Sequence, residues 1–255
     1  MIRPRVIPCL LLKGKGLVKT IQFKNPIYLG DPLNTINIFN KKMVDEMIIL
    51  DIDASLTSRK PNFELIKRIA SVCFSPLTYG GGVNNLSDAE RLFSIGIEKI
   101  SVNSIAFKNP SLITELAKKY GNQSVVVSIN INKDFWGNRN IVNNLLEKID
   151  LGGNSIAEQM MIFEELGAGE LLINDVNRDG TMKGYDIELI KSITSKVDIP
   201  VIACGGCGNY SHLKEVLIGG GASAAAAGSI FLFNGPHKAV LISYPQRKTI
   251  KNLLI

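Results

Sequence analysis

The chain has 255 residues, of which 45% are apolar and 20% charged, and this is the composition of an ordinary globular protein. No stretch is long and apolar enough to span a membrane, and the apolar run after residue 5 is too short for a signal peptide, so we expect a cytoplasmic, reduced protein. The net charge of +6 comes without a dense basic run with interleaved aromatics, which argues against a nucleic-acid partner and suits a phosphorylated small molecule.

Eight short apolar runs predict β-strands. Most are continuous rather than alternating, as is typical of parallel strands that are covered on both faces. In chain order they span residues 6–12, 47–52, 77–80, 99–102, 124–131, 170–174, 201–204 and 222–227.

Helical patterns lie between these strands. They span residues 32–40, 62–72, 86–95, 110–120, 156–166, 187–197 and 212–218. Eight strands with intervening helices and no linker predict an α/β fold, a single (β/α)₈ barrel domain over residues 1–255. The polar stretch 133–154 is interpreted as a long loop after the fifth strand, and the tail from about residue 234 departs from the pattern.

A sequence pattern occurs twice, 124 residues apart. The matched positions are Glu46 with Glu170, Asp51 with Asp175, and Gly81-Gly82 with Gly205-Gly206. A chain built from two copies of a strand–helix half predicts a barrel of two repeated half-barrels.

Glycines and small polar residues follow the strands of both halves. Glycine lets the backbone approach a phosphate, and nearby helix N-termini supply N–H donors. Barrel enzymes often bind phosphate after their last two strands. We therefore predict one cradle at Gly81, Gly82, Asn103 and Ser104, and a second at Asp179, Gly180, Thr181, Gly205, Gly206, Gly228 and Ser229. Two matched cradles predict a substrate with a phosphate at each end, although a single glycine pair can also mark a tight turn.

The four cysteines do not predict a metal or redox site. Cys9, Cys73 and Cys204 lie in or beside apolar segments and are interpreted as buried thiols. Cys204 and Cys207 form a lone C-x-x-C, for which a redox pair is an alternative. Zinc needs about four ligands, and only two histidines could assist, so we expect no metal and no cofactor.

The chain closely resembles the cyclase subunit of imidazole glycerol phosphate synthase over residues 1 to about 233. The matching stretches are RVIPCL at 5–10, GDP at 30–32, LDIDAS at 50–55, GGG at 80–82, NPSLI at 109–113, GAGE at 167–170 and RDGT at 178–181. The resemblance implies a bisphosphate substrate. It also implies ammonia that is made by a HisH-like glutaminase subunit at the N-terminal barrel face and moves through the barrel.

The resemblance further implies an ammonia gate at the barrel floor. The matching residues are Arg5, Glu46, Lys99 and Glu170. Each lies at or just before the start of a strand, so the side chains can converge, and two cations with two carboxylates lower the desolvation cost. A purely structural plug is the alternative. Glu98 and Gln123 match floor positions that face the glutaminase in that family.

The catalytic pair of that family does not match. Its two essential aspartates correspond to Leu11 and Asn130. Leucine cannot transfer protons and asparagine has no useful pKa, so each replacement should remove roughly 10²–10⁴-fold of rate. The catalytic residues are therefore unknown, with Asn130, Asp51 and Asp53 as weak candidates. Lys19 matches a mobile-loop lysine and is expected to clamp a phosphate.

A retained gate without the acid/base pair is similar to a divergent branch of the family associated with sugar amidation in surface-polysaccharide biosynthesis. The segment CLLLK at 9–13 and the tail VLISYP at 240–245 resemble that branch. The resemblance implies that ammonia passes to a sugar amidotransferase. The alternatives are an authentic cyclase (lyase) of histidine biosynthesis that uses other residues, and a non-catalytic scaffold that activates a glutaminase.

Overall fold

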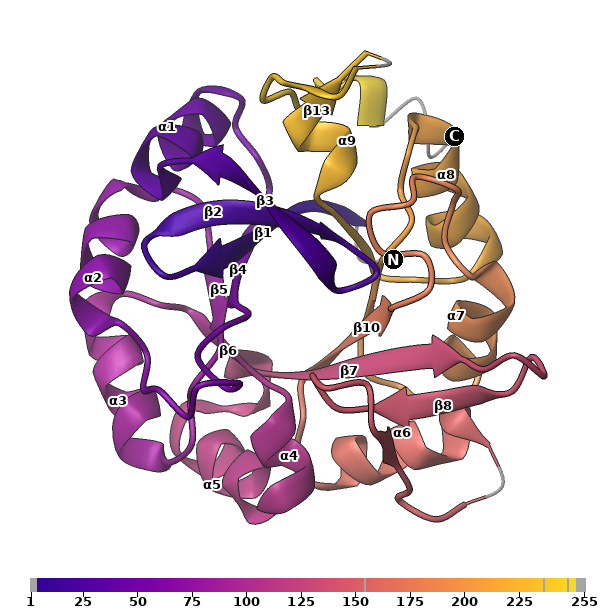
Figure 1. The fold of residues 1–255 in the computed structure, drawn as a ribbon. Helices are drawn as coiled ribbons and strands as arrows, with labels where there is room; N and C mark the ends of the chain where they lie inside the picture. Colours follow the sequence, from indigo (N-terminus) through magenta and orange to yellow (C-terminus); the bar gives the residue numbers. More distant parts are fainter. Residues whose placement is uncertain (1–3, 154, 236, 247, 251–255) are drawn as a thin grey trace.

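The protein forms a closed barrel of eight parallel strands, seen along its axis in Figure 1. This computed structural model describes residues 4–153, 155–235, 237–246 and 248–250. The barrel strands are β1 (Arg5–Lys13), β4 (Met47–Asp51), β5 (Leu77–Gly80), β6 (Lys99–Val102), β7 (Val125–Lys133), β10 (Glu170–Asp175), β11 (Val201–Cys204) and β12 (Ala224–Ala227). Each pairs in parallel with the next barrel strand, and β12 pairs with β1. The predicted (β/α)₈ barrel is confirmed, with every strand boundary within two residues of its prediction.

The helices cover the outside of the barrel. They are α1 (Pro32–Lys41), α2 (Phe63–Val72), α3 (Leu86–Ile95), α4 (Ser104–Lys108), α5 (Ser111–Tyr120), α6 (Ile156–Glu165), α7 (Ile187–Thr194), α8 (Tyr210–Lys214) and α9 (Ser229–Leu232), with a 3₁₀ turn at Asn122–Ser124. Most begin with a side chain that accepts a first-turn N–H, which satisfies a donor the helix itself cannot pair. These caps are Asp31, Asn62, Asn85, Ser155, Asp186 and Asn209.

Four helical segments differ from prediction. The short helices α4 and α9 were not predicted, because five and four residues are too few to show a helical period. Helix α7 ends at Thr194 instead of 197, where the Thr194 hydroxyl donates to the carbonyl of Gly220 at 2.8 Å. Helix α8 begins two residues earlier than predicted, because Asn209 caps it, and continues as a π-helical turn at Glu215–Gly219.

The prediction of a loop over residues 133–154 was wrong in part, and residue 154 lies outside the described residues. Strand β7 runs beyond the barrel and pairs antiparallel with β8 (Arg139–Val142), which pairs with β9 (Lys148–Ile149). The hydrogen bonds of such a ladder join backbone groups, so a polar sequence without apolar alternation can still form it. We call residues 133–139, which include the tip of the β7–β8 hairpin, the arm.

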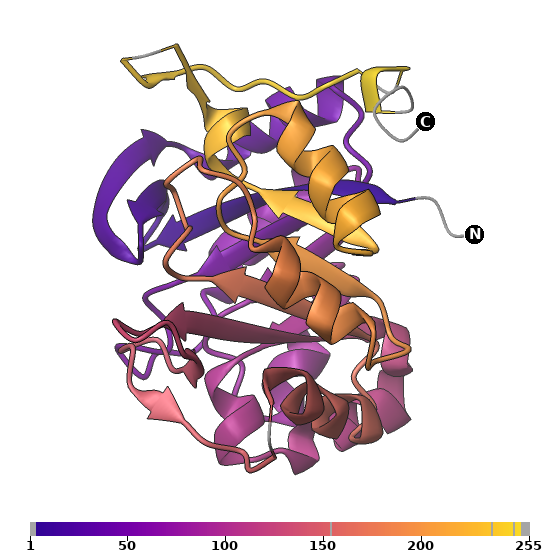
Figure 2. The ribbon, with the colours of Figure 1, turned by 90° about the vertical axis from the view of Figure 1, so that its right-hand side faces the viewer.

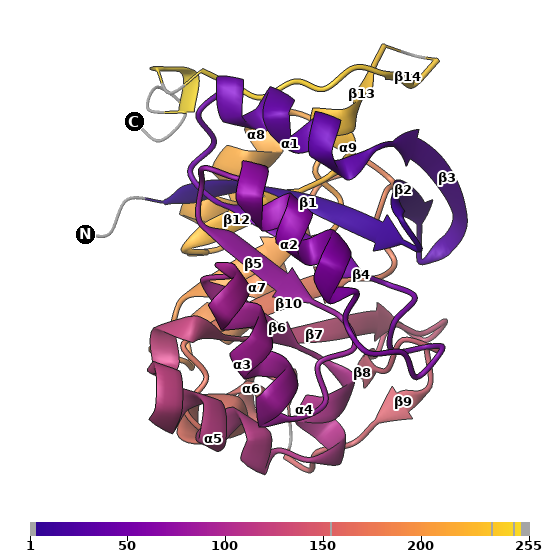
Figure 3. The ribbon, with the colours of Figure 1, turned by 90° about the vertical axis from the view of Figure 1, so that its left-hand side faces the viewer.

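The glycine- and lysine-rich segment after the first strand is also a hairpin rather than a loop. Strand β2 (Gly16–Ile21) pairs antiparallel with β1 and with β3 (Lys24–Gly30). Figures 2 and 3 show that this hairpin and the arm project from the same end of the barrel, opposite the start of β1. That end holds the carboxyl ends of the barrel strands, where catalysis occurs in such folds.

The core has two layers that the barrel wall separates. The larger layer packs helices against the outside of the strands. The smaller layer fills the barrel interior with Ile7, Cys9, Ile48, Val126, Leu172, Ile202, Ala224 and Ala226. In the tail, short strands β13 (Phe233–Asn234) and β14 (Ala239–Val240) precede Tyr244, whose hydroxyl donates to the carbonyl of Val6 at 2.8 Å. Among the described residues, no helix has both the length and the apolar character needed to cross a membrane.

Gly81 and Gly205 hold equivalent positions in the two half-barrels. Both have positive φ, +121° and +94°, and a Cβ would collide with the carbonyl oxygen of Asp51 at Gly81 and of Asp175 at Gly205. Asp51 and Asp175 are themselves related by the repeat. The structure therefore reproduces the sequence repeat as the same close backbone approach in each half.

Replacing either glycine should destabilise the barrel. We expect Gly81→Ala and Gly205→Ala each to lower the free energy of unfolding by about 2–5 kcal/mol, from left-handed strain plus a backbone collision. Gly14→Ala is the control, since its φ is +61° but nothing lies within 4 Å, so only about 1–2 kcal/mol should be lost. Chemical denaturation measures this, and equal losses at Gly14 and Gly81 would contradict the collision.

Candidate functional site

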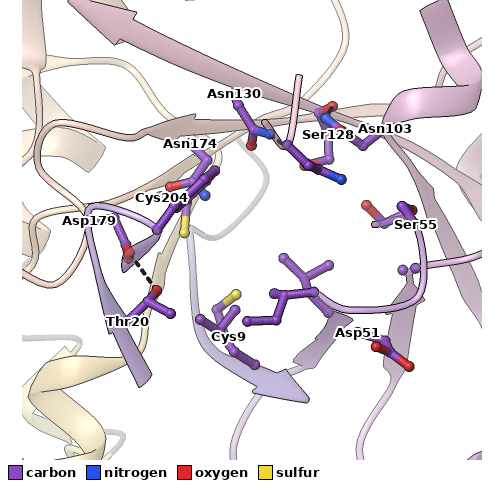
Figure 4. A pocket seen from close by; sticks show the side chains of 18 of the residues that line it. Cys9, Thr20, Asp51, Ser55, Asn103, Ser128, Asn130, Asn174, Asp179 and Cys204 are labelled. Carbon is purple, nitrogen blue, oxygen red and sulfur yellow. Dashed lines mark hydrogen bonds between the residues drawn. The ribbon is translucent and has the colours of Figure 1, made fainter. Parts of the chain in front are cut away.

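A pocket opens at the carboxyl ends of the barrel strands, and Figure 4 shows the side chains that surround it. The pocket draws on strands of both half-barrels and on the β2–β3 hairpin. The predicted residues that line it are Lys19, Asp51, Gly81, Gly82, Asn103, Ser104, Asn130, Asp179, Gly180, Gly205, Gly206, Gly228 and Ser229. Most of the site predicted from sequence is therefore gathered in one place.

Two predicted residues lie outside the pocket lining. The Thr181 hydroxyl donates to the carbonyl of Arg178 at 2.8 Å, which closes its own turn. Asp53 lies in the loop after β4, where its backbone N–H donates to Asp51 at 3.2 Å and its carbonyl accepts from Thr57. Adjacency in sequence suggested both residues, but the turns direct them elsewhere.

The cradle predicted in the first half-barrel is held in shape by hydrogen bonds of asparagine side chains. Asn103 Nδ2 donates to the carbonyl of Ser128 at 2.6 Å. The Ser104 hydroxyl accepts from Asn144 Nδ2 at 3.3 Å, and Asn144 Oδ1 accepts from Asn130 Nδ2 at 3.1 Å. Asn144, in the turn after β8, thus joins the cradle to one of the two positions where the acid/base pair was expected. Asn144 was not predicted as a site residue, because the loop expected over residues 133–154 gave no spatial placement.

The second-half cradle is built from close backbone contacts. Gly205 and Gly206 have φ of +94° and +107°, and Gly206 packs against the carbonyl of Gly184. A Cβ at Gly228 would lie 3.0 Å from the carbonyl oxygen of Cys9. Ser229, which is buried, follows at the start of α9. Only glycine allows the chain to approach this closely, because a Cβ at Gly205 or Gly206 would collide with neighbouring backbone atoms.

Lys19 lies in the pocket wall but is not free. Its Nζ lies 2.6 Å from Asp179 Oδ1, and both side chains are buried. The Thr20 hydroxyl donates to Asp179 Oδ2 at 3.0 Å, as Figure 4 shows, and Gln22 N donates to the carbonyl of Asp179 at 2.9 Å. The β2–β3 hairpin is thereby fastened to the loop after β10, and a phosphate would have to compete with Asp179 for Lys19.

The acid/base positions carry no proton-transfer group. Leu11 and Asn130 both line the pocket, and Asn130 is buried with its amide bonded to Asn144. Asn174 pairs in register with Asn130 on the neighbouring strand and also lines the pocket. Its buried Oδ1 has no hydrogen-bond partner in the described part of the chain. Asn174 was not predicted as a site residue, although its place at the end of the sixth barrel strand could have indicated it.

Asp51 is the buried carboxylate at the edge of the pocket. Its oxygens lie 2.9 and 3.1 Å from Arg59 Nη2, and Oδ1 also accepts from the N–H groups of Asp53 and Ala54. These contacts hold the loop after β4 in place, and they pair the Asp51 carboxylate with the Arg59 guanidinium. The repeat partner Asp175 sits outside the pocket lining, and burial raises its pKa.

A closed ring of four charges lies at the other end of the barrel. We call Arg5, Glu46, Lys99 and Glu170 the floor ring. Arg5 lies 2.5 Å from Glu46 and 2.8 Å from Glu170, and Lys99 lies 3.0 Å from Glu46 and 3.1 Å from Glu170. Burial acts to lower the pKa of Arg5, but the carboxylates of Glu170 and Glu46 outweigh it and raise that pKa. The predicted convergence of the four residues is therefore observed.

The interior between floor ring and pocket is mainly apolar, with hydroxyls along one side. Thr78, Ser101 and Ser128 are buried on the adjacent strands β5, β6 and β7. The Thr78 hydroxyl donates to Glu46 of the floor ring at 3.1 Å, while Ser101 and Ser128 line the pocket. Glu98 and Gln123 are exposed beside the starts of β6 and β7, on the floor side.

The cysteines are all free thiols in the described residues. Cys9 and Cys204 both line the pocket, and their side chains lie next to each other in Figure 4. Contact with Cys204, together with burial, raises the pKa of Cys9, and burial raises the pKa of Cys207 to about 12. Such thiols stay protonated and poorly nucleophilic at neutral pH. No cluster of three or more histidine, cysteine or acidic residues with metal-binding geometry occurs in the described ranges.

Comparison with known proteins identifies the family. A profile described as "Histidine biosynthesis protein" matches residues 5–236. The chain is 50% identical over 245 residues to "Putative imidazole glycerol phosphate synthase subunit hisF2" of Pseudomonas aeruginosa, covering 96% of this chain and 97% of that one. It is 47% identical to a similarly named HisF protein of Leptospira borgpetersenii, covering 96% of both chains. It is 40% identical over 233 residues to "Imidazole glycerol phosphate synthase subunit HisF" of Chlorobium limicola, covering 91% and 92%.

These matches extend over nearly the whole chain and over both half-barrels. Together with the closed parallel barrel, they show that the chain belongs to the histidine biosynthesis protein family, as a HisF-like relative of the cyclase subunit of imidazole glycerol phosphate synthase.

Proposed function

We propose that this protein receives ammonia from a HisH-like glutaminase and passes it through the barrel to a sugar amidotransferase in O-antigen or surface-polysaccharide biosynthesis. One observation carries the proposal. The closed floor ring lies beneath a pocket in which Leu11 and Asn130 occupy the acid/base positions. The protein would act in the cytoplasm, with residues 1–255 as one barrel domain.

The floor ring suits a gate for a small neutral molecule. Each carboxylate is shared by the two cations, so one cation can move aside while the other still holds both anions. Beyond the ring, ammonia would meet the hydroxyls of Thr78, Ser101 and Ser128, which can donate and accept hydrogen bonds. Glu98 and Gln123, exposed at the floor, would contribute to the glutaminase interface.

The absence of a proton-transfer pair in this pocket favours amidation of the sugar on another protein. The Asn130 amide, which has no useful pKa, is hydrogen-bonded to Asn144, and the Asp51 carboxylate is paired with Arg59. Neither side chain is therefore available as a general base. The glycine cradles remain open to the pocket and would bind a phosphorylated ligand at both ends. A floor ring beneath a pocket without a proton-transfer pair favours a partner enzyme as the site where ammonia reacts.

An authentic cyclase of histidine biosynthesis is the second candidate. It is favoured by the two glycine cradles and Lys19 in one pocket, and by relatives named as imidazole glycerol phosphate synthase subunits. A scaffold that only activates a glutaminase would require neither cradle, so the pocket supports it least.

A cyclase assay separates the first two candidates. With the bisphosphate intermediate and saturating ammonium salt, the protein should turn over roughly 10²–10⁴-fold more slowly for each missing proton-transfer group. Leu11→Asp combined with Asn130→Asp should raise the rate, since both positions line the pocket. Rapid turnover by the unaltered protein would instead establish a histidine enzyme.

The floor ring can be tested at Lys99. In a complex with the glutaminase and the amidotransferase, Lys99→Ala should change the ratio of sugar amidated to glutamine hydrolysed about fivefold or more. Amidation driven by added ammonium salt should persist. Lys119→Ala is the control, because that lysine pairs with Glu90 on the exposed outer surface. An unaltered ratio in a folded Lys99→Ala complex would indicate a structural plug.

Anion binding tests the two cradles. Crystals grown in phosphate or sulfate should hold one anion near Gly82 and Asn103 and another near Gly206 and Ser229. Calorimetry with inorganic phosphate should show Ser229→Ala to bind roughly tenfold more weakly, through loss of a charge-assisted hydrogen bond. Thr181→Val, outside the pocket lining, should bind as before. Cradles that stay empty at high anion concentration would refute phosphate binding.

A further inference from the structure

The tip of the arm exposes two aromatic side chains to solvent. Phe135 is 96% exposed and Trp136 83%, and their rings meet edge to face with centroids 5.6 Å apart. The pair buries almost nothing against its own chain, so it adds little to the stability of the fold. Neighbouring aromatic residues on a surface are typical of the anchors of a protein–protein interface.

The turn that carries this pair is held by several hydrogen bonds. Asp134 N donates to the carbonyl of Asn138 at 2.9 Å, and Gly137 N donates to the carbonyl of Asp134 at 3.0 Å. The Asp134 carboxylate accepts from Asn138 N at 2.8 Å and from Asn138 Nδ2 at 3.2 Å. The aromatic rings are therefore presented on an ordered turn, which lowers the entropy lost on binding.

The arm is joined to the β2–β3 hairpin through one residue. Asn177 Oδ1 accepts from Lys133 N, and its Nδ2 donates to the carbonyl of Lys133. The carbonyl of Asn177 accepts from Gln22 Nε2 at 2.7 Å. The arm, the loop after β10 and the hairpin tip thus form one continuous surface. We call it the rim surface, and its exposed side chains include Ile21, Lys24, Lys133, Phe135, Trp136 and Lys183.

The rim surface is basic as well as apolar. Lys24, Lys133 and Lys183 are exposed, and none makes an ion pair within the described ranges. Its hairpin and loop also supply Thr20 and Gly180 to the pocket wall. The surface therefore borders the pocket mouth and complements an acidic partner that has an apolar recess.

We propose that the rim surface docks the sugar amidotransferase that consumes the ammonia, with Phe135 and Trp136 as anchors and the three lysines facing carboxylates. This inference rests on the proposed function. Ammonia that escapes from an open mouth becomes ammonium in water and loses its nucleophilic lone pair. A partner seated on the rim closes the mouth and keeps the molecule neutral until it reaches the acceptor.

A membrane surface is the competing occupant for a basic, aromatic patch. The pair sits on a narrow hairpin, and the rim surface that carries it also supplies Thr20 and Gly180 to the pocket wall, whereas a lipid surface favours a broad amphipathic face. This narrow presentation, on a surface that reaches the pocket, favours a protein.

The experiment measures binding of the purified amidotransferase to the immobilised complex of this chain with its glutaminase. The double variant Phe135→Ser/Trp136→Ser should bind about 30-fold or more weakly. Lys133→Glu should slow association at low salt more than at high salt. Ile38→Ser is the control, since Ile38 is 37% exposed on α1, which covers the outside of the barrel, and should leave amidotransferase binding unchanged. Glutaminase binding and thermal stability should stay the same in the double variant.

The outcomes separate this inference from the function on which it rests. If the unaltered complex binds the amidotransferase and amidates sugar, and the double variant does so equally well, the rim surface is refuted while the function stands. If the unaltered complex neither binds the amidotransferase nor amidates sugar, the proposed function is refuted, and the docking surface that rests on it is refuted as well. Co-sedimentation with phosphatidylglycerol vesicles that the double variant abolishes would overturn the protein partner in favour of a lipid surface.

Discussion

The organisation of this protein depends on four charges that neutralise one another at the start of the barrel. Arg5, Lys99 and Glu170 open three of its strands, and Glu46 directly precedes a fourth. Each cation reaches both carboxylates, so no charge is left unpaired where water is scarce. Burying such groups singly would cost several kcal/mol each, and the closed ring offsets that cost. The pairing also ties together strands from both half-barrels, which sets the axis along which floor and pocket align.

The far end of the barrel has the repeated glycine turns, but it carries Leu11 and Asn130 where the resemblance predicted an acid/base pair. Glycines in both halves bring the backbone against the carbonyls of Asp51 and Asp175, and the pocket lies between them. Where proton transfer would be expected, Asn130 and Asn174 lie side by side, and Leu11 also lines the pocket. Amides can position a ligand but do not exchange protons at neutral pH. The proposed function therefore assigns the reaction of ammonia to a partner enzyme.

Sequence patterns predicted the site well where each residue is fixed by its place on a strand. Residues at strand ends, such as Asn103 and Gly205, follow from strand position in a parallel barrel. The floor ring was implied by the family resemblance, and the position of its residues at strand starts agreed with it. Thr181 and Asp53 failed to reach the pocket because turn hydrogen bonds, which a linear pattern does not reveal, direct them elsewhere. Asn144 reaches the cradle through a hairpin that carries no periodic signal.

The sequence by itself determined the eight strands, the helices between them and the internal repeat, because each follows from local periodicity or from self-comparison. Only the tertiary structure decided that Lys19 is held by Asp179, 160 residues away, and that residues 133–139 form an arm displaying Phe135 and Trp136. Backbone ladders and long-range ion pairs depend on which segments meet in space, and that is settled when β7 pairs with β10 and the barrel closes.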